Sequence, residues 1–307
     1  MKETFDRLYS STLRAFPTAG KTILWLLKII IPISLAVSLL QYWGIIASIA
    51  NILEPAFSLI GLPGESAIVF ISSIFLTLYA PIAVIATLSL DMREITILAL
   101  MCLISHNLFV ESAVQKKTGS SAIIMFLLRI ITSFIGAYLL NLLLPDHIGG
   151  NLVAQKTVVF NNITDMLTSW LVGASWLVLK ITLIITGLMI LQSILKEFKI
   201  LDILSKIFAP LMRLLGLSAD SSFLWFVAQT IGLTYGSAVL IEEVENNEIS
   251  LANANLLNYH IAINHSLLED TLLFVAIGVP AGWIIAPRFI LAIIVVWGVR
   301  GIIKLKN

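Results

Sequence analysis

The sequence predicts an all-α polytopic membrane protein made of two inverted repeats, each with three membrane spans and one re-entrant helical hairpin. The 307-residue chain is 59% hydrophobic and only 12% charged. Its mean hydropathy is +1.00, and a soluble domain cannot bury so large an apolar fraction. The chain also repeats itself, and its Lys and Arg residues are unevenly distributed between the predicted loops. These last two observations set the predicted number and direction of the spans.

Composition also excludes several classes of protein. A net charge of +1 argues against a nucleic-acid-binding protein, which needs a basic face. The single cysteine, Cys102, excludes a disulfide scaffold and a Cys-based metal cluster. We find neither a nucleophile–base spacing nor a metalloprotease motif such as H-E-x-x-H. The sequence therefore predicts no enzyme, no catalytic residue, no metal-ligand set and no cofactor.

Residues 1–21 are expected to form an interfacial amphipathic helix. Phe5, Leu8, Leu13 and Phe16 recur at roughly helical spacing among charged residues, which is typical of a helix lying on a membrane surface. Pro17 is expected to end this helix. The segment lacks the short apolar run and small-residue cleavage site of a signal peptide.

Eight apolar segments follow. Six are long and continuous enough to span a bilayer: Thr22–Ala50, Ile95–Val114, Ser121–Leu144, Ser169–Leu195, Leu251–Ile277 and Trp283–Ile303. The other two, Ser66–Leu90 and Ser221–Val244, are interrupted near the middle by Thr77–Pro81 and Gly232–Ser237. Because Gly and Pro interrupt helices, these two are predicted to be the hairpins.

The two halves of the chain align with each other. Ile52–Glu65 matches Ile207–Asp220 without a gap, at an offset of 155 residues. Further matches pair Tyr79 with Tyr235, His106 with His265, and Glu111 with Asp270 or its neighbour Glu269. The predicted organisation is one integrated membrane domain: a first repeat at 22–144, an extracytoplasmic linker at 145–168 and a second repeat at 169–303.

The positions of the basic residues favour hairpins over two additional spans. We counted the Lys and Arg residues on each side of the membrane, leaving aside Lys28, Arg129 and Lys180 within spans. In the hairpin arrangement only three of the counted residues fall outside the cytoplasm: Arg93, Lys156 and Arg288. With eight spans the cations are almost evenly divided. The hairpin arrangement gives each half an odd number of spans, so the halves are inverted, and it places both termini in the cytoplasm.

Polar residues within the apolar segments mark the predicted site, because such groups are costly in a membrane. The predicted substrate-binding residues are Ser72, Ser73, Thr77, Tyr79, His106, Asn107, Gln229, Thr230, Thr234, Tyr235, His260, Asn264 and His265. The predicted coupling residues are Glu111, Glu269, Asp270 and Lys180, with Lys180 also a candidate partner for a buried carboxylate. On a continuous helix, His106 and Glu111 would face different directions. The alternative for the Asn, Ser and Thr residues is interhelical or local hydrogen bonding.

One stretch of sequence is distinctive. It reads Glu111-Ser-Ala-Val-Gln-Lys-Lys-Thr-Gly119, and it follows Leu62–Glu65, Tyr79-Ala80, Asp91–Leu100 and Ser105–Asn107. These segments resemble the bacterial nucleoside-recognition, or Gate-domain, membrane family, whose distant relatives include concentrative nucleoside transporters, ferrous-iron permeases and spore maturation membrane proteins. The resemblance implies a transport fold with re-entrant hairpins in the bacterial cytoplasmic (inner) membrane. The chain has no GTP-binding P-loop and is shorter than a full concentrative nucleoside transporter.

Three functions remain open at this stage. The first is a transporter of a small polar solute, nucleoside-like or other, with alternating access around the two hairpin tips and coupling to a proton or Na⁺. The second is a membrane scaffold or partner subunit, as in the spore maturation relatives. The third is a divalent-cation permease. The expected partners are membrane lipid, a small-molecule substrate and a coupling ion, with homo-oligomerisation left open.

Overall fold

The computed structural model describes residues 2–146, 148, 162–230, 232, 239–241, 243–246 and 248–306. Within these residues the chain is helical and contains no strand. The helices are α1 (Lys2–Tyr42), α2 (Ile45–Ser58), α3 (Ser66–Phe75), α4 (Tyr79–Ile85), α5 (Met92–Ser105), α6 (Leu108–Lys117), α7 (Ala122–Leu143), α8 (Ile163–Glu197), α9 (Ile200–Met212), η1 (Ala219–Ser221), α10 (Ser222–Thr230), α12 (Leu251–Ile263), α13 (Glu269–Ala276) and α14 (Ala281–Lys306).

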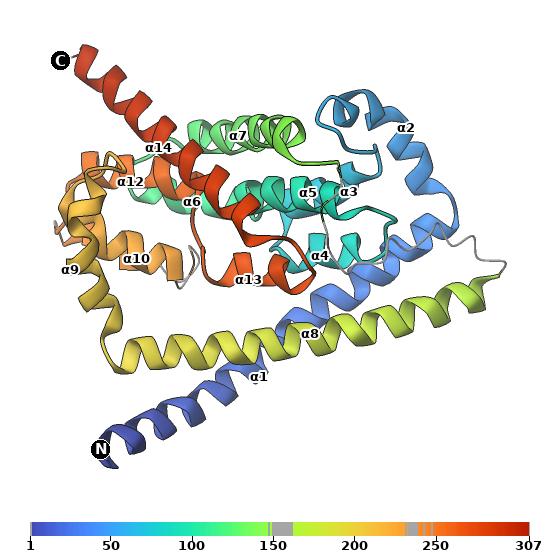
Figure 1. Ribbon diagram of the computed structural model, residues 1–307, viewed down its shortest axis with the longest axis horizontal. Coiled ribbons are helices and arrows are strands. Elements are labelled where there is room, and N and C mark those ends of the chain that lie inside the picture. Colours follow the sequence, from blue (N-terminus) through green and yellow to red (C-terminus); the bar gives the residue numbers. More distant parts are fainter. Residues whose placement is uncertain are drawn as a thin grey trace.

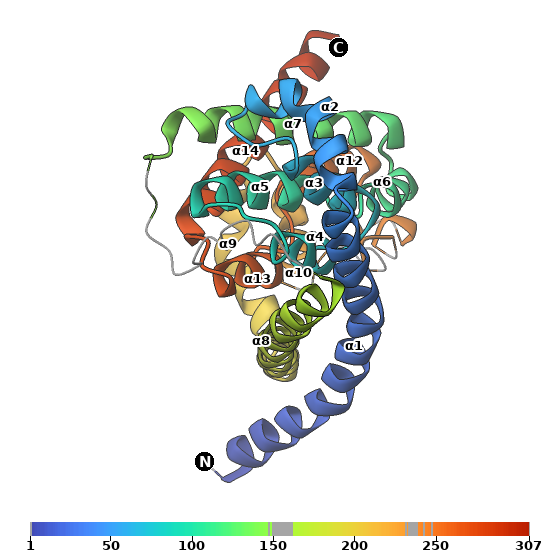
Figure 2. The same ribbon diagram turned by 90° about the vertical axis from the view of Figure 1, so that its right-hand side faces the viewer.

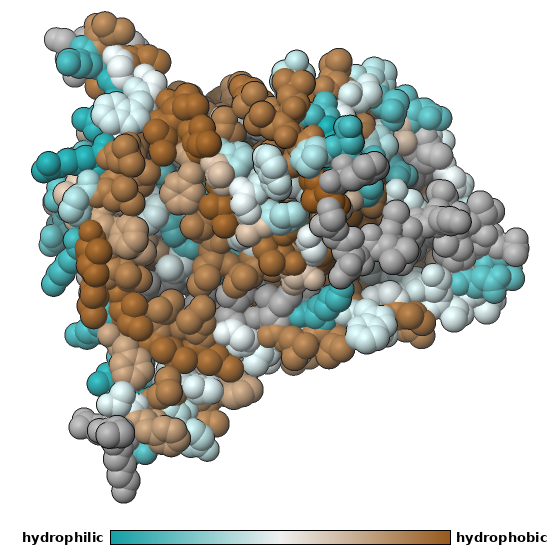
Figure 3. Space-filling model, in the orientation of Figure 1, coloured by the Kyte–Doolittle hydropathy of each residue, from teal (hydrophilic) through white to brown (hydrophobic). Residues whose placement is uncertain are grey.

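Four segments of the described chain are long and apolar enough to cross a membrane. They are Met92–Lys117, Ala122–Leu143, Ile163–Leu195 and Ala281–Leu305. Large apolar side chains remain exposed on α9 and α14, and Figure 3 shows apolar atoms over the part of the surface that these two helices cover. Exposed apolar helices of this kind are expected where a protein faces lipid rather than water.

The N-terminal helix is longer than predicted. α1 runs through Pro17 and Pro32, so the expectation that Pro17 ends a first helix is wrong. α1 packs along α8, and the Ser11 and Ser193 hydroxyls are 3.0 Å apart across this contact. Such tertiary contacts offset the hydrogen bond that each proline removes. Figures 1 and 2 show α8 crossing α1, with the N-terminal end of α1 extending away from the rest of the molecule.

Three of the predicted spans are broken. Thr22–Ala50 breaks at Trp43-Gly44, where Gly44 has a φ of 72°. Ile95–Val114 divides into α5 and α6, and Leu251–Ile277 divides into α12 and α13. The last two breaks fall next to non-glycine residues with positive φ, Asn107 (49°) and Ser266 (47°), a conformation that cannot continue a right-handed helix.

The predicted interruption in the first hairpin segment is present, since α3 ends at Phe75 and α4 begins at Tyr79. Apart from Gly232, the corresponding interruption at Gly232–Ser237 lies outside the described residues.

Backbone features recur at matching positions in the two halves. A side-chain N-cap precedes both α5 and α12, from Asp91 and Ser250. Glycines with positive φ occur at Gly61 (72°) and Gly216 (75°), and again at Gly119 (96°) and Gly278 (102°). These matched turns position the helices that meet at the centre of the molecule.

The core is centred on α5. Every residue from Ile95 to Ser105 is buried, and α5 contacts α3, α7, α12, α13 and α14. α5 therefore ends inside the protein rather than at its surface, and its last carbonyl groups need partners there.

Candidate functional site

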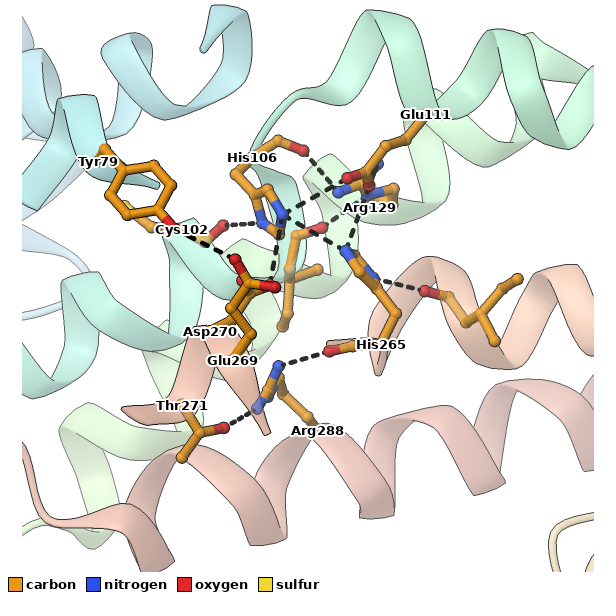
Figure 4. A network of polar contacts seen from close by, with 12 residues as sticks. Tyr79, Cys102, His106, Glu111, Arg129, His265, Glu269, Asp270, Thr271 and Arg288 are labelled. Carbon is orange, nitrogen blue, oxygen red and sulfur yellow. Dashed lines mark hydrogen bonds and ion pairs between the residues drawn. The ribbon is translucent and has the colours of Figure 1, made fainter. Parts of the chain in front are cut away.

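The broken helices of the two halves meet at their breaks. His106 follows the end of α5, and His265 lies just after α12. Their ring centroids are 5.0 Å apart and their Nε2 atoms 3.4 Å apart. Figure 4 shows the two rings facing each other at the centre of a network of polar side chains.

Backbone hydrogen bonds to neighbouring helices stabilise the chain at both breaks. The Asn107 N–H donates to the carbonyl groups of Ser73 (2.8 Å) and Leu76 (3.0 Å), at the end of α3. The Ser266 N–H donates to the carbonyl of Ala228 in α10, at 2.9 Å. α3 and α10 thus supply acceptors for N–H groups that have lost their helical partners.

Two fully buried arginines satisfy the carbonyl groups at these breaks. Arg129 on α7 donates to Ile104 O (2.6 Å) and His106 O (2.7 Å). Arg288 on α14 donates from Nη1 to His265 O at 3.2 Å. A cation near the C-terminal end of a helix also interacts favourably with the helix dipole.

Each arginine also reaches the helix beyond the break. Arg129 Nη1 is 2.7 Å from Glu111 Oε2, and Arg288 Nη2 donates to Thr271 Oγ1 at 2.8 Å. Neither arginine is among the site residues predicted from the sequence. In the charge count Arg129 is set aside as a residue within a span and Arg288 is counted as extracytoplasmic, whereas both are fully buried. The signal that identifies them is their separation, which equals the 159 residues between His106 and His265.

The hydrogen bonds of the two imidazoles fix their tautomers. His106 Nδ1 is 3.1 Å from Cys102 O, and His265 Nδ1 is 2.7 Å from Ile261 O. A carbonyl oxygen can only accept, so each Nδ1 carries the proton. When neutral, each imidazole therefore presents an Nε2 lone pair to the centre of the cluster.

Carboxylates surround these two Nε2 atoms. Glu111 Oε1 lies 3.4 Å from His106 Nε2, and Glu111 Oε2 lies 3.4 Å from His265 Nε2. Asp270 Oδ2 is 3.5 Å from His106 Nε2. The expectation that His106 and Glu111 face different directions is wrong, because the helix is interrupted at Asn107, whose φ is 49°.

Other predicted residues border this cluster. The Tyr79 hydroxyl donates to Glu269 Oε1 at 3.1 Å. Gln229 Nε2 donates to the Asn264 carbonyl at 2.6 Å. The Asn264 side chain is fully buried, and neither of its amide atoms has a hydrogen-bond partner among the described residues. Asn264 is thus a polar group available to a ligand.

Several predicted residues lie elsewhere or bond locally. The hydroxyl groups of Ser72, Ser73 and Thr230 donate to carbonyl groups of their own helices, as the alternative interpretation of these residues expects. Thr77 lies between α3 and α4, and its buried Oγ1 has no partner among the described residues. Thr234 and Tyr235 are outside the described residues.

His260 and Lys180 are also separate from the cluster. His260 Nδ1 accepts from Trp225 Nε1 at 3.3 Å in a second apolar core. Lys180 is exposed on α8, where it lines a largely apolar cavity of about 460 Å³ beside α4, α5 and α8. Arg129, rather than Lys180, is the basic partner of the buried Glu111.

A further polar contact joins α6 to α12. Gln115 Nε2 donates to Asn258 O at 3.1 Å, and Asn258 Nδ2 donates to the Thr118 and Ser120 hydroxyls, each at 2.9 Å. These bonds connect residues from both halves, and they are the interhelical hydrogen bonding expected of buried amides in membrane proteins.

Comparison with known proteins decides the family. Residues 23–140 match the Gate family, described as nucleoside recognition. The chain is also 33% identical over 266 residues to the uncharacterized membrane protein YvoD of Bacillus subtilis (strain 168), covering 85% of each chain. The protein belongs to the Gate family of membrane proteins. No solved structure matches this Gate protein.

Proposed function

We propose that this Gate protein is a secondary transporter that moves a small polar solute, nucleoside-like or other, across the bacterial cytoplasmic membrane. The observation that supports this most directly is the meeting of two broken helices around a buried polar cluster. Irregular backbone inside a membrane protein is tolerated where it is buried or lines a pathway, and in transporters broken helices form substrate and ion sites.

The proposed solute-binding groups are those with hydrogen-bonding capacity left at the breaks. Asn264 has both amide atoms unpartnered, and Gln229 Oε1 and Thr77 Oγ1 are also buried without partners among the described residues. An unsatisfied buried polar group costs about 1–3 kcal/mol. A polar solute that donates to and accepts from these groups would recover that cost.

The charge of the cluster favours a cation as the coupling ion. Glu111, Glu269 and Asp270 provide three carboxylates, whereas Arg129 and Arg288 provide two guanidinium groups. With neutral imidazoles the set carries one net negative charge. A bound cation would compensate this charge, which in a low-dielectric site is costly when uncompensated.

The proposal includes two inverted repeats, each with three spans and a re-entrant hairpin, and both termini in the cytoplasm. The recurrence of caps, positive-φ glycines, histidines and arginines at matching positions supports the repeat. Arg288 is buried, so it does not count as a loop residue. Without it, fewer basic loop residues fall outside the cytoplasm in the hairpin arrangement, which strengthens the charge bias that favours hairpins. Alternating access would then move one half against the other around the cluster.

A ligand screen followed by a flux measurement tests the function. The purified protein is heated in detergent with nucleosides, amino acids and organic acids, because a ligand that binds the native state raises the unfolding temperature. Any hit is then assayed for uptake into proteoliposomes under a proton or Na⁺ gradient. We expect Asn264→Ala to abolish uptake and Ser72→Ala, whose hydroxyl bonds its own helix, to preserve it.

Several results would contradict the proposal. No hit and no flux, together with a co-purifying protein, would favour the scaffold alternative. Uptake of a divalent cation with no organic solute would favour the permease alternative. Equal uptake by Asn264→Ala and the native protein would place the solute elsewhere.

A further inference from the structure

We propose that His106, His265 and Asp270 form a binding site for a divalent first-row transition-metal ion. One nitrogen from each imidazole and one carboxylate oxygen lie within 4.8 Å of one another, and all three residues are buried. The ligands come from both halves of the chain. This proposal goes beyond transport, because metal binding is measured without any solute.

The proposed ligand atoms lack hydrogen-bond donors. Both imidazoles use Nδ1–H to donate to backbone carbonyls, so the Nε2 of each neutral ring is an acceptor. The two Nε2 atoms nevertheless face each other at 3.4 Å. Asp270 Oδ2, 3.5 Å from His106 Nε2, has no hydrogen-bond partner among the described residues. Three buried acceptors that converge without a donor are stabilised when a cation, either a metal ion or a proton, lies between them.

The distances between the proposed ligand atoms also fit a metal ion. Charge-assisted hydrogen bonds between nitrogen and oxygen are about 2.7–2.9 Å long, shorter than the 3.5 Å between His106 Nε2 and Asp270 Oδ2. Ligand atoms about 2.0–2.1 Å from a tetrahedral ion lie roughly 3.3–3.4 Å from each other. The His106–His265 and His106–Asp270 separations therefore match the edges of a metal coordination tetrahedron, and all three ligand atoms lie within 4.8 Å of one another.

The backbone carbonyls that accept hydrogen bonds from the two histidines also fit a metal site. Metal-binding histidines usually donate their other ring N–H to a carbonyl or carboxylate, which fixes the tautomer and the ring orientation. Cys102 O and Ile261 O play this part for His106 and His265, one helical turn before each break. The arrangement is the same in both halves.

The neighbouring charges are compatible with a cation. Arg129 faces the cluster but is engaged by Glu111 and by two carbonyls. Arg288 is engaged by Thr271 and by two carbonyls. Glu111 approaches both imidazoles and Glu269 accepts from Tyr79. The carboxylates outnumber the guanidinium groups by one, so with neutral imidazoles the set carries a net negative charge that favours a cation.

The donor types indicate the class of metal. Two imidazole nitrogens and one carboxylate suit Zn²⁺, Fe²⁺, Co²⁺ or Ni²⁺, whereas Mg²⁺ and Ca²⁺ prefer oxygen ligands alone. Three protein ligands leave a coordination position for water or solute.

Co²⁺ is a direct probe, because tetrahedral Co²⁺ has an intense visible absorption band. The full-length protein, purified in detergent and stripped with a chelator, is titrated with Co²⁺ and then with competing Zn²⁺. We expect one Co²⁺ per chain and displacement by Zn²⁺ but not by Mg²⁺. His106→Gln, His265→Gln and Asp270→Asn should each weaken binding by more than about 100-fold, which exceeds the usual effect of losing an outer-shell partner.

His260→Gln is the matched control, since His260 is also fully buried on α12 but lies outside the cluster. It should bind Co²⁺ like the native protein. Folding of each variant is checked without metal by its elution profile and unfolding temperature. The proposal is overturned if the native protein binds no Co²⁺ or Zn²⁺, or if folded ligand variants bind as tightly as His260→Gln. Binding without solute flux would contradict only the transport proposal.

Discussion

At the scale of single residues, Arg129 connects the helix break to the charge of the cluster. Its guanidinium bonds two carbonyls at the end of α5 and pairs with Glu111, while the residue is fully buried. A planar guanidinium has five donors in a fixed arrangement, which a lysine could not reproduce. Arg129 therefore supports the backbone and compensates a carboxylate at once.

Replacement of Arg129 should strongly destabilise the protein. Arg129→Gln leaves Glu111 buried without its cation, and breaking a buried ion pair from one side costs about 3–5 kcal/mol. We expect a loss of this size in the free energy of unfolding, measured by detergent denaturation with circular dichroism. Removing both charges in Arg129→Gln/Glu111→Gln should recover part of the loss, because neither charge is then unpaired.

Lys180→Gln is the control for this experiment, since Lys180 is exposed on α8. A surface change should alter stability by no more than about 0.5 kcal/mol. If Arg129→Gln unfolds at the same denaturant concentration as Lys180→Gln, the Arg129–Glu111 pair is not a structural pair.

The chemistry of these residues was only partly predictable from sequence. His106, Glu111, His265 and Asp270 were selected because ionisable groups are costly within apolar segments. Arg288 obeys the same rule, although the charge count places it among the extracytoplasmic residues. Which cation pairs with Glu111 depends on how α7 packs against α6, and no sequence pattern reports that contact.

At the scale of helices, the breaks explain most of the differences from the predicted spans. Hydropathy and periodicity do not detect the break between α5 and α6, because the residues on both sides remain apolar. The interruption between α3 and α4 was predictable because Pro81 marks it. By contrast, neither Asn107 nor Ser266 is a glycine or a proline, and carbonyl acceptors on neighbouring helices stabilise both residues at positive φ.

The conformation of Asn107 gives a test of its role. At a φ of 49°, glycine is accommodated freely, whereas a β-branched residue is strained. We expect Asn107→Gly to keep native stability within about 1 kcal/mol and Asn107→Val to lose at least the 1–2 kcal/mol typical of a left-handed residue. Thermal unfolding in detergent measures both.

Glycine and valine substitutions at Ser266, where φ is 47°, should have the same two effects on stability. This series also separates a backbone role for Asn107 from the substrate role that the sequence suggested. If Asn107→Gly is folded but no longer binds a ligand that the native protein binds, then the side chain contacts the ligand and the backbone interpretation is incomplete.

At the scale of the whole molecule, the two halves meet through residues that occupy matching positions. The repeat is visible in the sequence as a series of matches in the same order, at offsets of 155 to 159 residues, and it predicts that His106 corresponds to His265. It did not predict that the two rings would touch, with centroids 5.0 Å apart. A repeat in the sequence indicates which residues of the two halves occupy equivalent positions. Whether those residues touch depends on how the two halves pack against each other.

The orientation of the whole chain in the membrane depends on whether Ser66–Leu90 crosses it. If the segment is a hairpin, positions 10, 117 and 206 share the cytoplasmic side, and positions 91 and 146 are extracytoplasmic. If it crosses once, position 10 is separated from position 117. All five positions are exposed, so single cysteines there are accessible to a thiol reagent, and the buried Cys102 is replaced by alanine to give a cysteine-free background.

We expect a membrane-impermeant maleimide applied to intact cells to label Asp91→Cys and Asp146→Cys, and to leave Ser10→Cys, Lys117→Cys and Lys206→Cys unlabelled. All five should react after permeabilisation, which controls for accessibility. The physical reason is that Lys and Arg residues are retained in the cytoplasm during insertion, and the hairpin arrangement is the one that keeps the Lys116–Lys117 and Lys196–Arg213 clusters there. Labelling of Lys117→Cys in intact cells while Ser10→Cys stays protected would show that Ser66–Leu90 crosses the membrane, and the inverted relationship of the two halves would then be lost.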